Sequence, residues 1–167
     1  DLRLVARDHG YPWAQAIAQF KFQGDPGWAA TLAALVRQVP GTEAALAAAD
    51  WVLPVPLARD RLRERGFNQA LQLARQLAPH KTQAQWLLRV RSTPVQHTLP
   101  RAQRLRNLAG AFAIEPLRQQ QMAGGRAVLV DDVMTTGATL QAAAAALRAA
   151  GVVHTTALCI ARTPVRN

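Results

Sequence analysis

The chain has 167 residues, of which 50% are hydrophobic and 18% are charged, enough apolar material for one globular domain with a buried core. This composition excludes a disordered chain and a coiled coil. No apolar run approaches the roughly 18 residues that a membrane-spanning helix needs, so we expect no membrane insertion. Because Cys159 is the only cysteine, an intrachain disulfide and a cysteine zinc cluster are excluded, and we expect a cytoplasmic protein.

Positive charge dominates the sequence and is concentrated in its middle. The 20 basic residues outnumber the 10 acidic ones, giving a formal net charge of +10, and all but two of the basic residues are arginine. Residues 54–110 carry a net charge of +9, from ten arginines and one lysine against two acids. Arginine forms forked contacts with phosphate, so an anionic partner is expected for this segment. The alternative is that these arginines only solubilise an alanine-rich chain.

The first half of the chain predicts two helices, a strand, a further helix and a second strand. Residues 11–39 place apolar side chains at helical spacing on both sides of a turn signal at Gly24–Gly27. Residues 51–56 read as a short strand that runs into a loop, since their two prolines cannot donate to a sheet ladder. A helix is expected from about Asn68, whose side chain suits an N-cap, and residues 86–90 are the second candidate strand.

The clearest unit is a βαβ unit near the C-terminus. Residues 127–130 are fully apolar and break into Asp131 and Asp132, as expected of a buried parallel strand that reaches its carboxyl end. Residues 140–150 are almost entirely helix formers, and residues 152–160 read as the next strand.

The connection between that strand and helix holds the candidate site, because ligands of open α/β sheets bind at such crevices. Threonine hydroxyls, a glycine that permits close backbone approach and the N–H groups that open the helix together make a phosphate cradle. The cradle consists of Thr135, Thr136, Gly137, Ala138 and Thr139. Asp131 and Asp132 are suited to accept hydrogen bonds from a neutral diol such as ribose.

Other interpretations of this run fit less well. A capped βα turn with exposed acids needs only one capping residue and does not explain the whole run. A Walker A loop requires a Gly-Lys-Ser/Thr end and a Rossmann fingerprint requires three spaced glycines, and neither occurs here. A phosphoacceptor receiver domain also places acids at strand ends, but it does not need the threonine-rich loop.

Two segments carry a family resemblance. Residues 128–139 resemble the phosphoribosyl pyrophosphate (PRPP) signature of type I phosphoribosyltransferases. Val55-Pro56-Leu57, followed by Arg61–Gln69 with its Arg-Gly-Phe-Asn-Gln run, resembles the hallmark of the ComF/GntX family of competence-associated phosphoribosyltransferase-like proteins. Further matches to that family are Phe20–Gly24, Arg91, Thr93, Gln96, Leu99, Arg104, Asn107, Gly110 and Phe112.

The resemblance implies an α/β fold of the type I phosphoribosyltransferase kind, with a central, mostly parallel sheet flanked by helices. In a single domain, residues 1–50 are expected to form a small helical hood and residues 51–167 the core. The N-terminal zinc-binding segment of many relatives is absent from this sequence, and the four histidines show no ligand spacing. Cys159, in an apolar strand, is expected to be a buried, inert thiol.

The resemblance also implies roles for individual residues. Asp131 and Asp132 would contact the ribose 2′ and 3′ hydroxyls, and residues 135–139 would grip the 5′-phosphate. The loop after the first core strand, residues 54–65, would bind pyrophosphate. The anion contacts expected there are Arg61 and Arg65.

A flap that closes over bound PRPP is implied for residues 91–110, with Arg104 as a contact. The implied reaction is the displacement of pyrophosphate from PRPP by a nitrogen nucleophile, with Mg²⁺ required and the acceptor left open. Alternatives from other classes remain, namely a non-catalytic PRPP-binding protein, or a module that binds single-stranded DNA or competence proteins.

Overall fold

The computed structural model describes residues 2–8, 13–23, 26–91 and 107–163. The first half of the chain contains β1 (Leu2–Asp8), α1 (Trp13–Gln23), α2 (Pro26–Arg37), α3 (Thr42–Ala48), β2 (Trp51–Pro54), α4 (Arg59–Arg65) and α5 (Gln69–Leu77). The second half contains β3 (Leu87–Arg89), β4 (Phe112–Ile114), α7 (Pro116–Met122), β5 (Arg126–Met134), α8 (Ala138–Ala149) and β6 (His154–Arg162).

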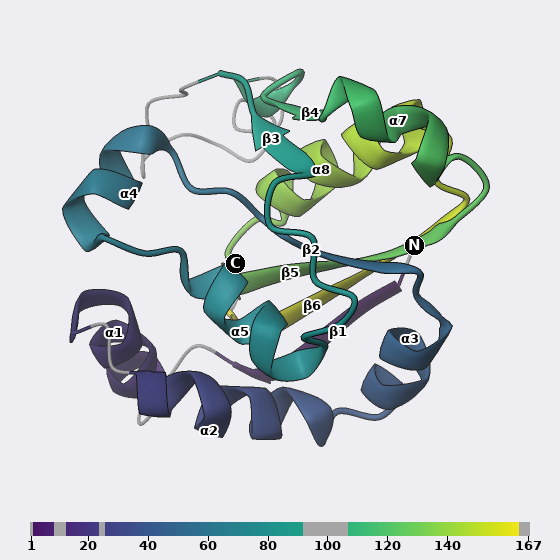
Figure 1. The fold of residues 1–167 in the computed structure, drawn as a ribbon. Coiled ribbons are helices and arrows are strands. Elements are labelled where there is room, and N and C mark those ends of the chain that lie inside the picture. The colour runs from purple at the N-terminus through teal and green to yellow at the C-terminus, as the bar shows by residue number, and fades with distance from the viewer. Residues whose placement is uncertain (1, 9–12, 24–25, 92–106, 164–167) are drawn as a thin grey trace.

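A four-stranded sheet forms the centre of the molecule (Figure 1). Its strands follow the order β1-β6-β5-β2, and all neighbouring pairs are parallel. The predicted parallel sheet and the predicted βαβ unit, β5-α8-β6, are both confirmed. The strand predicted at residues 86–90 is also present, but β3 pairs antiparallel with β4 in a separate two-stranded sheet.

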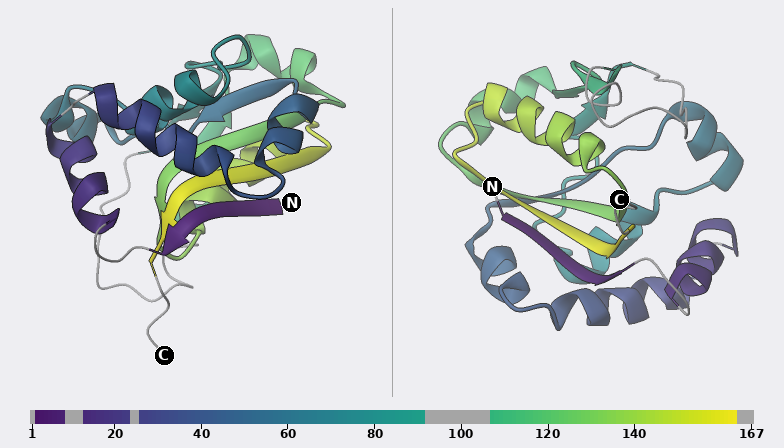
Figure 2. Two further views of the ribbon diagram at one scale, coloured as in Figure 1. Left: turned by 90° about the horizontal axis from the view of Figure 1, so that it is seen from below. Right: turned by 180° about the vertical axis from the view of Figure 1, so that it is seen from behind.

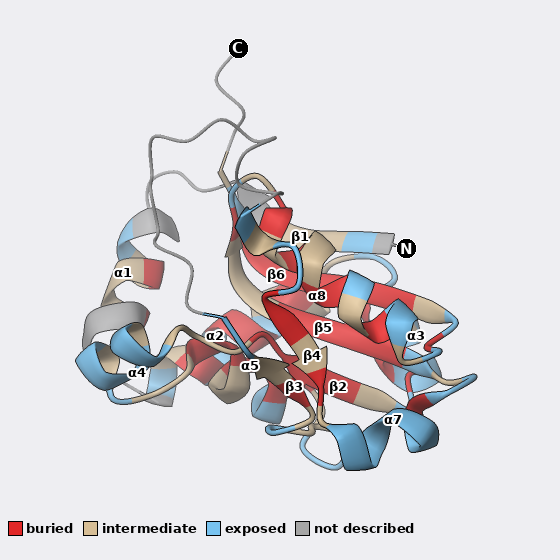
Figure 3. Cartoon of the chain, turned by 90° about the horizontal axis from the view of Figure 1, so that it is seen from above, coloured by how far each residue is buried: buried red, intermediate tan, exposed pale blue. Residues whose placement is uncertain are grey.

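Helices cover both faces of the central sheet, with α2 and α5 on one face and α8 on the other (Figures 1 and 2). Because side chains alternate along a strand, β5 contributes to two cores. One core lies under α2 and α5 and includes Leu32, Leu73, Val128, Val130 and Leu158. The other lies under α8 and includes Leu53, Leu129, Ala143, Leu147 and Cys159. Strands β5 and β6 are accordingly buried along most of their length (Figure 3).

The first 50 residues contain a strand as well as helices. Strand β1 was not predicted, and it pairs with β6 at the edge of the central sheet, with Leu4 opposite Leu158. Helix α2 packs against β1 and β6, so it is part of the layer that covers the sheet. Residues 1–50 therefore add both an edge strand and a covering layer to the core.

The predicted N-cap of α5 is confirmed and also ties the helix to the sheet. The Asn68 side chain accepts a hydrogen bond from the backbone N–H of Ala70 (3.0 Å) and donates one to the carbonyl of Val55 (3.1 Å), just beyond β2. One residue thus fixes both the start of α5 and the point at which the chain leaves β2.

Lys81 caps α3 from a distant part of the chain. Its ammonium donates to the carbonyls of Leu46 (2.9 Å), Ala47 (2.8 Å) and Ala49 (2.8 Å), at the negative end of the helix dipole. We expect Lys81→Met to lower the free energy of unfolding by about 2 kcal/mol, measured by urea denaturation. Arg75→Met, which removes an exposed cation from α5, is the control, and an equal loss in both variants would contradict the capping role.

Candidate functional site

The chains that follow β2 and β5 diverge at the carboxyl ends of these two strands, and this switch point of the sheet is called the crevice below. The N–H of Val55 still donates to the carbonyl of Val130 (2.9 Å), but the two chains then part. The chain after β2 leads to α5 on one face of the sheet, and the chain after β5 leads to α8 on the other (Figure 1). In an open α/β sheet such a divergence marks the place where ligands bind, at the carboxyl ends of the strands.

Asp131 and Asp132 lie at this point, within β5 and beyond its pairing with β2. The pairing of β2 ends with Pro54 opposite Val130, whereas β5 continues beside β6 as far as Met134. The prediction that the strand ends at the two acids is therefore wrong, because β5 stays paired with β6 beyond them.

The two carboxylates are half-buried and held by the backbone. The Oδ1 of Asp131 accepts the N–H of Asp132 (2.9 Å), and the Oδ1 of Asp132 accepts the N–H of Val133 (2.6 Å). The arrangement presents two neighbouring, oriented carboxylates at the mouth of the crevice.

The predicted phosphate cradle lies at the N-terminus of α8, which begins at Ala138 rather than at the expected Leu140. Gly137 occupies the N-cap position with a φ of 74°, a left-handed conformation that favours glycine. The N–H of Ala138 donates to the Thr136 hydroxyl (3.4 Å). The first N–H groups of a helix have no acceptor within it and carry the positive end of its dipole, so this turn can hold an oxyanion.

The stretch predicted as a pyrophosphate loop is only partly a loop. Residues 55–58 have no regular structure, but Arg59–Arg65 form helix α4, so the expectation of a loop throughout residues 54–65 is wrong. No residue of α4 is buried, and Leu62 is its single apolar side chain, so apolar periodicity gives no sign of the helix (Figure 3). Arg61 and Arg65 are half-buried.

Sequence reasoning missed Arg89, on β3, which adds a further element to the candidate site. Burial lowers the pKa of the Arg89 guanidinium, the positive charge of Arg61 lowers it further, and the negative charge of Asp131 opposes both. Arg61 and Asp131 are therefore each within electrostatic reach of Arg89. The Arg89 guanidinium also lies over the ring of Phe112, 5.6 Å from its centroid, which fixes its position.

The Arg-Gly-Phe-Asn-Gln run forms the joint between α4 and α5. Gly66 ends α4, with its N–H donated to the carbonyl of Leu62 (2.8 Å), and Asn68 caps the start of α5. Phe67 packs against Phe20, with ring centroids 6.1 Å apart. The run therefore fixes the direction in which α4 leaves the sheet.

Parts of the expected site lie outside the described residues. Arg104 is among them, as are residues 92–106 of the predicted flap. Within the described part of the chain, no helix is long and apolar enough to cross a membrane. The same residues contain no group of three or more histidine, cysteine, aspartate or glutamate side chains arranged to hold a metal ion.

Cys159 is buried, as predicted, and lies opposite Asp131 in the sheet register. Burial raises the pKa of the thiol well above its ordinary value, and the charges of Asp131 and Asp132 raise it further, against the effect of Arg3. The thiolate is the reactive form. We therefore expect no reaction with Ellman's reagent at pH 8 in the native protein and complete reaction in guanidinium chloride; rapid reaction of the native thiol would contradict this burial.

Comparison with known proteins identifies a family that this chain matches. The family model of the phosphoribosyl transferase domain matches residues 62–165. The DNA utilization protein YhgH of Salmonella typhi is 36% identical over 170 residues, which cover 96% of this chain and 72% of that protein. The protein of the same name from Escherichia coli (strain K12) is 34% identical over 174 residues, with the same coverage. Competence protein F of Haemophilus influenzae is 34% identical over 165 residues, 91% of this chain and 69% of that protein. No solved structure gives a significant match.

Proposed function

The chain belongs to the ComF-type phosphoribosyltransferase-like family, and from this membership we propose that it binds PRPP with Mg²⁺ and transfers the phosphoribosyl group to a nitrogen nucleophile. The observation that carries the proposal is the succession of two acids and a helix N-terminus along the β5–α8 connection. Asp131 and Asp132 stand at the carboxyl end of β5, and the N-terminus of α8 follows within a few residues. Carboxylates suit a diol and a helix N-terminus suits a phosphate, so this connection has groups for both ends of a ribose 5-phosphate.

The ribose and its phosphate would be held from the β5–α8 side of the crevice. Asp131 and Asp132 would accept hydrogen bonds from the 2′ and 3′ hydroxyls. The 5′-phosphate would lie at the helix N-terminus, among Thr135, Thr136, Gly137, Ala138 and Thr139. Since Gly137 has no side chain, the backbone of this turn can approach the phosphate closely.

The pyrophosphate would be held by arginines from two other elements. Arg61 on α4 and Arg89 on β3 are like charges held near each other, an arrangement that a polyanion between them would stabilise. Arg65, half-buried on the same helix, is the other expected contact. Mg²⁺ binds proteins through one or two carboxylates plus substrate phosphates, and the Asp131–Asp132 pair fits that pattern; the ion would neutralise charge on the pyrophosphate.

In this proposal the residues act mainly by positioning and electrostatics. Asp131 and Asp132 orient the ribose ring as positive charge develops at its C1′. Arg61 and Arg89 stabilise the negative charge that the departing pyrophosphate gains as the bond to C1′ breaks and the bond to the acceptor nitrogen forms.

Calorimetric titration of the intact chain with PRPP and Mg²⁺ tests the proposal. We expect saturable binding of PRPP, weaker binding of ribose 5-phosphate, which lacks the pyrophosphate, and release of pyrophosphate when a suitable nucleobase is added. Binding without release of pyrophosphate with any nucleobase would reduce the function to PRPP binding alone. An absence of binding by the intact chain would overturn the whole proposal.

A second candidate is the binding of single-stranded DNA, favoured by the basic segment 54–110 and by the names of the two kinds of relatives. The aromatic faces available for base stacking in that segment are largely occupied. Phe67 packs on Phe20, and Trp86 contacts both the Trp51 ring (5.8 Å between centroids) and the guanidinium of Arg118 (5.2 Å from the Trp86 centroid). Binding would therefore depend on arginine–phosphate contacts, and fluorescence anisotropy with an oligonucleotide should show a steep loss of affinity with salt. No binding at physiological salt would exclude this candidate.

A further inference from the structure

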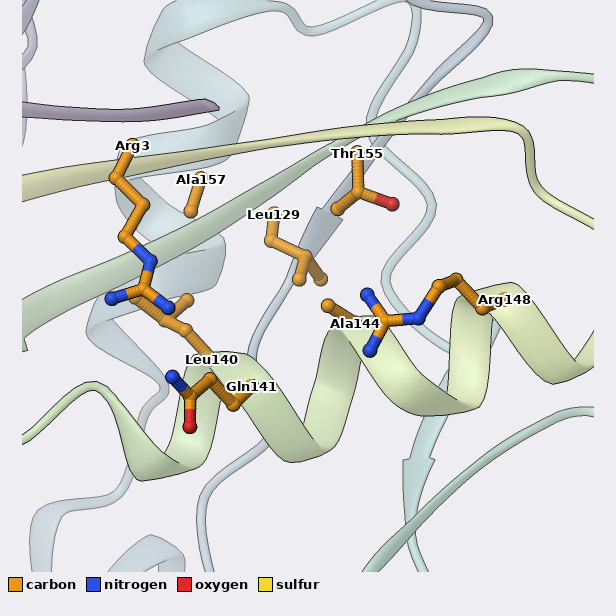
Figure 4. Close-up of a pocket in the computed structure, with 8 residues that line it drawn as sticks. All are labelled: Arg3, Leu129, Leu140, Gln141, Ala144, Arg148, Thr155 and Ala157. Atoms are coloured by element: carbon orange, nitrogen blue, oxygen red, sulfur yellow. The ribbon is translucent and has the colours of Figure 1, made fainter. Parts of the chain in front are cut away.

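A separate cavity of about 330 Å³ lies beside α8, on the side of the sheet away from α5 (Figure 4). It is bounded by α8 and by the strands β5, β6 and β1, so the edge strand β1 forms one of its walls. Its apolar lining consists of Leu129, Leu140, Ala144 and Ala157. Asp131 and Asp132 are not among its lining residues, which separates this cavity from the crevice described above.

Two arginines flank this apolar lining. Arg3 comes from β1 and Arg148 from the last turn of α8, and Figure 4 shows both guanidinium groups directed over the cavity. Both arginines are exposed, so ligands can reach them from solvent. Gln141, which lies about 10 Å along the helix from Arg148, adds an amide group near Arg3. Two of the eight lining residues that the structure describes are arginines, and none of these eight is acidic.

A buried hydroxyl in the wall lacks a hydrogen-bond partner. Thr155 is only 3% exposed, and its Oγ1 has no partner within the part of the chain that the structure describes. Buried polar atoms without a partner are rare in native proteins, and each requires an explanation. A bound acceptor atom in the cavity would provide the missing hydrogen bond.

We propose that this cavity binds a small organic anion, a molecule with a carboxylate or phosphate group on an apolar body. Guanidinium groups form forked, charge-assisted hydrogen bonds with both kinds of acid, and the Thr155 hydroxyl supplies a neutral donor. The apolar lining favours an organic molecule over a bare inorganic ion, because it gains from covering hydrocarbon. The volume suits a ligand at the small end of the usual range.

Arg3 also connects this cavity to the phosphate cradle. Its Nη1 lies 3.2 Å from the position that a Cβ on Gly137 would occupy. Arg3 therefore borders both the cavity and Gly137, the N-cap of α8. A ligand that moves the Arg3 side chain toward the cavity would also move it relative to Gly137. The two sites are distinct in their lining but adjacent through this one side chain.

Calorimetric titration with adipate, glycerol 3-phosphate and inorganic phosphate tests the proposal. We expect saturable binding of at least one of the two organic anions, weakened roughly tenfold or more by Arg148→Gln, which removes a charged contact. Thr155→Val, which keeps the shape of the side chain, should weaken binding of the same anion while the protein remains folded. Arg75→Gln, an equal loss of charge on α5, is the matched control and should leave binding unchanged.

The choice of probes also distinguishes a carboxylate ligand from a phosphate ligand, and binding in this cavity from binding at the cradle. Preference for adipate assigns a carboxylate ligand, and preference for glycerol 3-phosphate a phosphate ligand. Because a phosphate also suits the cradle at residues 135–139, only binding that Arg148→Gln and Thr155→Val reduce counts in favour. No saturable binding, binding of inorganic phosphate alone, or an equal loss in Arg75→Gln would overturn the proposal.

Discussion

Simultaneous replacement of Asp131 and Asp132 by alanine is expected to weaken PRPP binding about a hundredfold or more. Each substitution would remove a carboxylate that accepts a hydrogen bond from a ribose hydroxyl. The loss of one such charge-assisted bond weakens affinity by roughly tenfold or more. The side chains are half-buried at the mouth of the crevice, not in either core, so the variant should keep its fold. Calorimetric titration in Mg²⁺, with circular dichroism as the check on folding, measures the loss.

The matched control for this variant is Asp60→Ala/Glu64→Ala. It removes the same two negative charges from exposed positions on α4, so any general effect of net charge is reproduced there. We expect the control to bind PRPP as well as the unmodified chain or slightly better, since it leaves the arginines of α4 with less opposing charge. Equal affinity in the two double variants would show that the acids of β5 do not hold the ribose.

Replacement of Arg61 and Arg89 by glutamine is expected to weaken PRPP binding about thirtyfold while changing the affinity for ribose 5-phosphate little. The reason is that both guanidinium groups are assigned to the pyrophosphate, which ribose 5-phosphate lacks. Parallel titrations with the two ligands measure the difference. A loss of equal size for both ligands would contradict the assignment.

The control for this second variant lies on the same helix. Arg59→Gln/Arg63→Gln removes two exposed guanidinium groups with the same change in net charge. We expect a change of less than about threefold, because exposed charges at a distance are screened by salt. An equally large effect in the control would mean that the general positive field, and not Arg61 and Arg89 themselves, attracts the ligand.

The βαβ unit was predictable because its signals are local. A fully apolar strand, an alanine-rich helix and a glycine stop stand next to one another in the chain, and propensity and burial agree there. The acids and the threonine-rich turn are part of the same continuous run, so the sequence alone brings together that half of the proposed site. The N-cap at Asn68 was predictable for the same reason, since capping involves only neighbouring residues.

The other half of the proposed site depends on contacts between distant segments. Arg89 lies near Arg61 and Asp131 because β3 pairs with β4 in a sheet separate from the central one. No local sequence pattern indicates this pairing. Helix α4 was missed because it has no buried face. Strand β1 does show apolar residues around Arg3, a pattern that fits an edge strand, but its place beside β6 follows from packing and not from its own sequence.

The parting of the chain after β2 and β5 has a consequence for unfolding. The elements proposed to hold the anion are attached to opposite layers: α4 is joined through Phe67 to the core under α5, whereas β3 and α8 belong to the core under α8. A ligand that bridges them acts as a cross-link, so neither layer opens while the ligand stays bound. At a ligand concentration about a hundred times the Kd, this linkage adds about 2.7 kcal/mol. Amide hydrogen exchange in α5 and α8 would then slow together, although the two helices lie on opposite faces of the sheet.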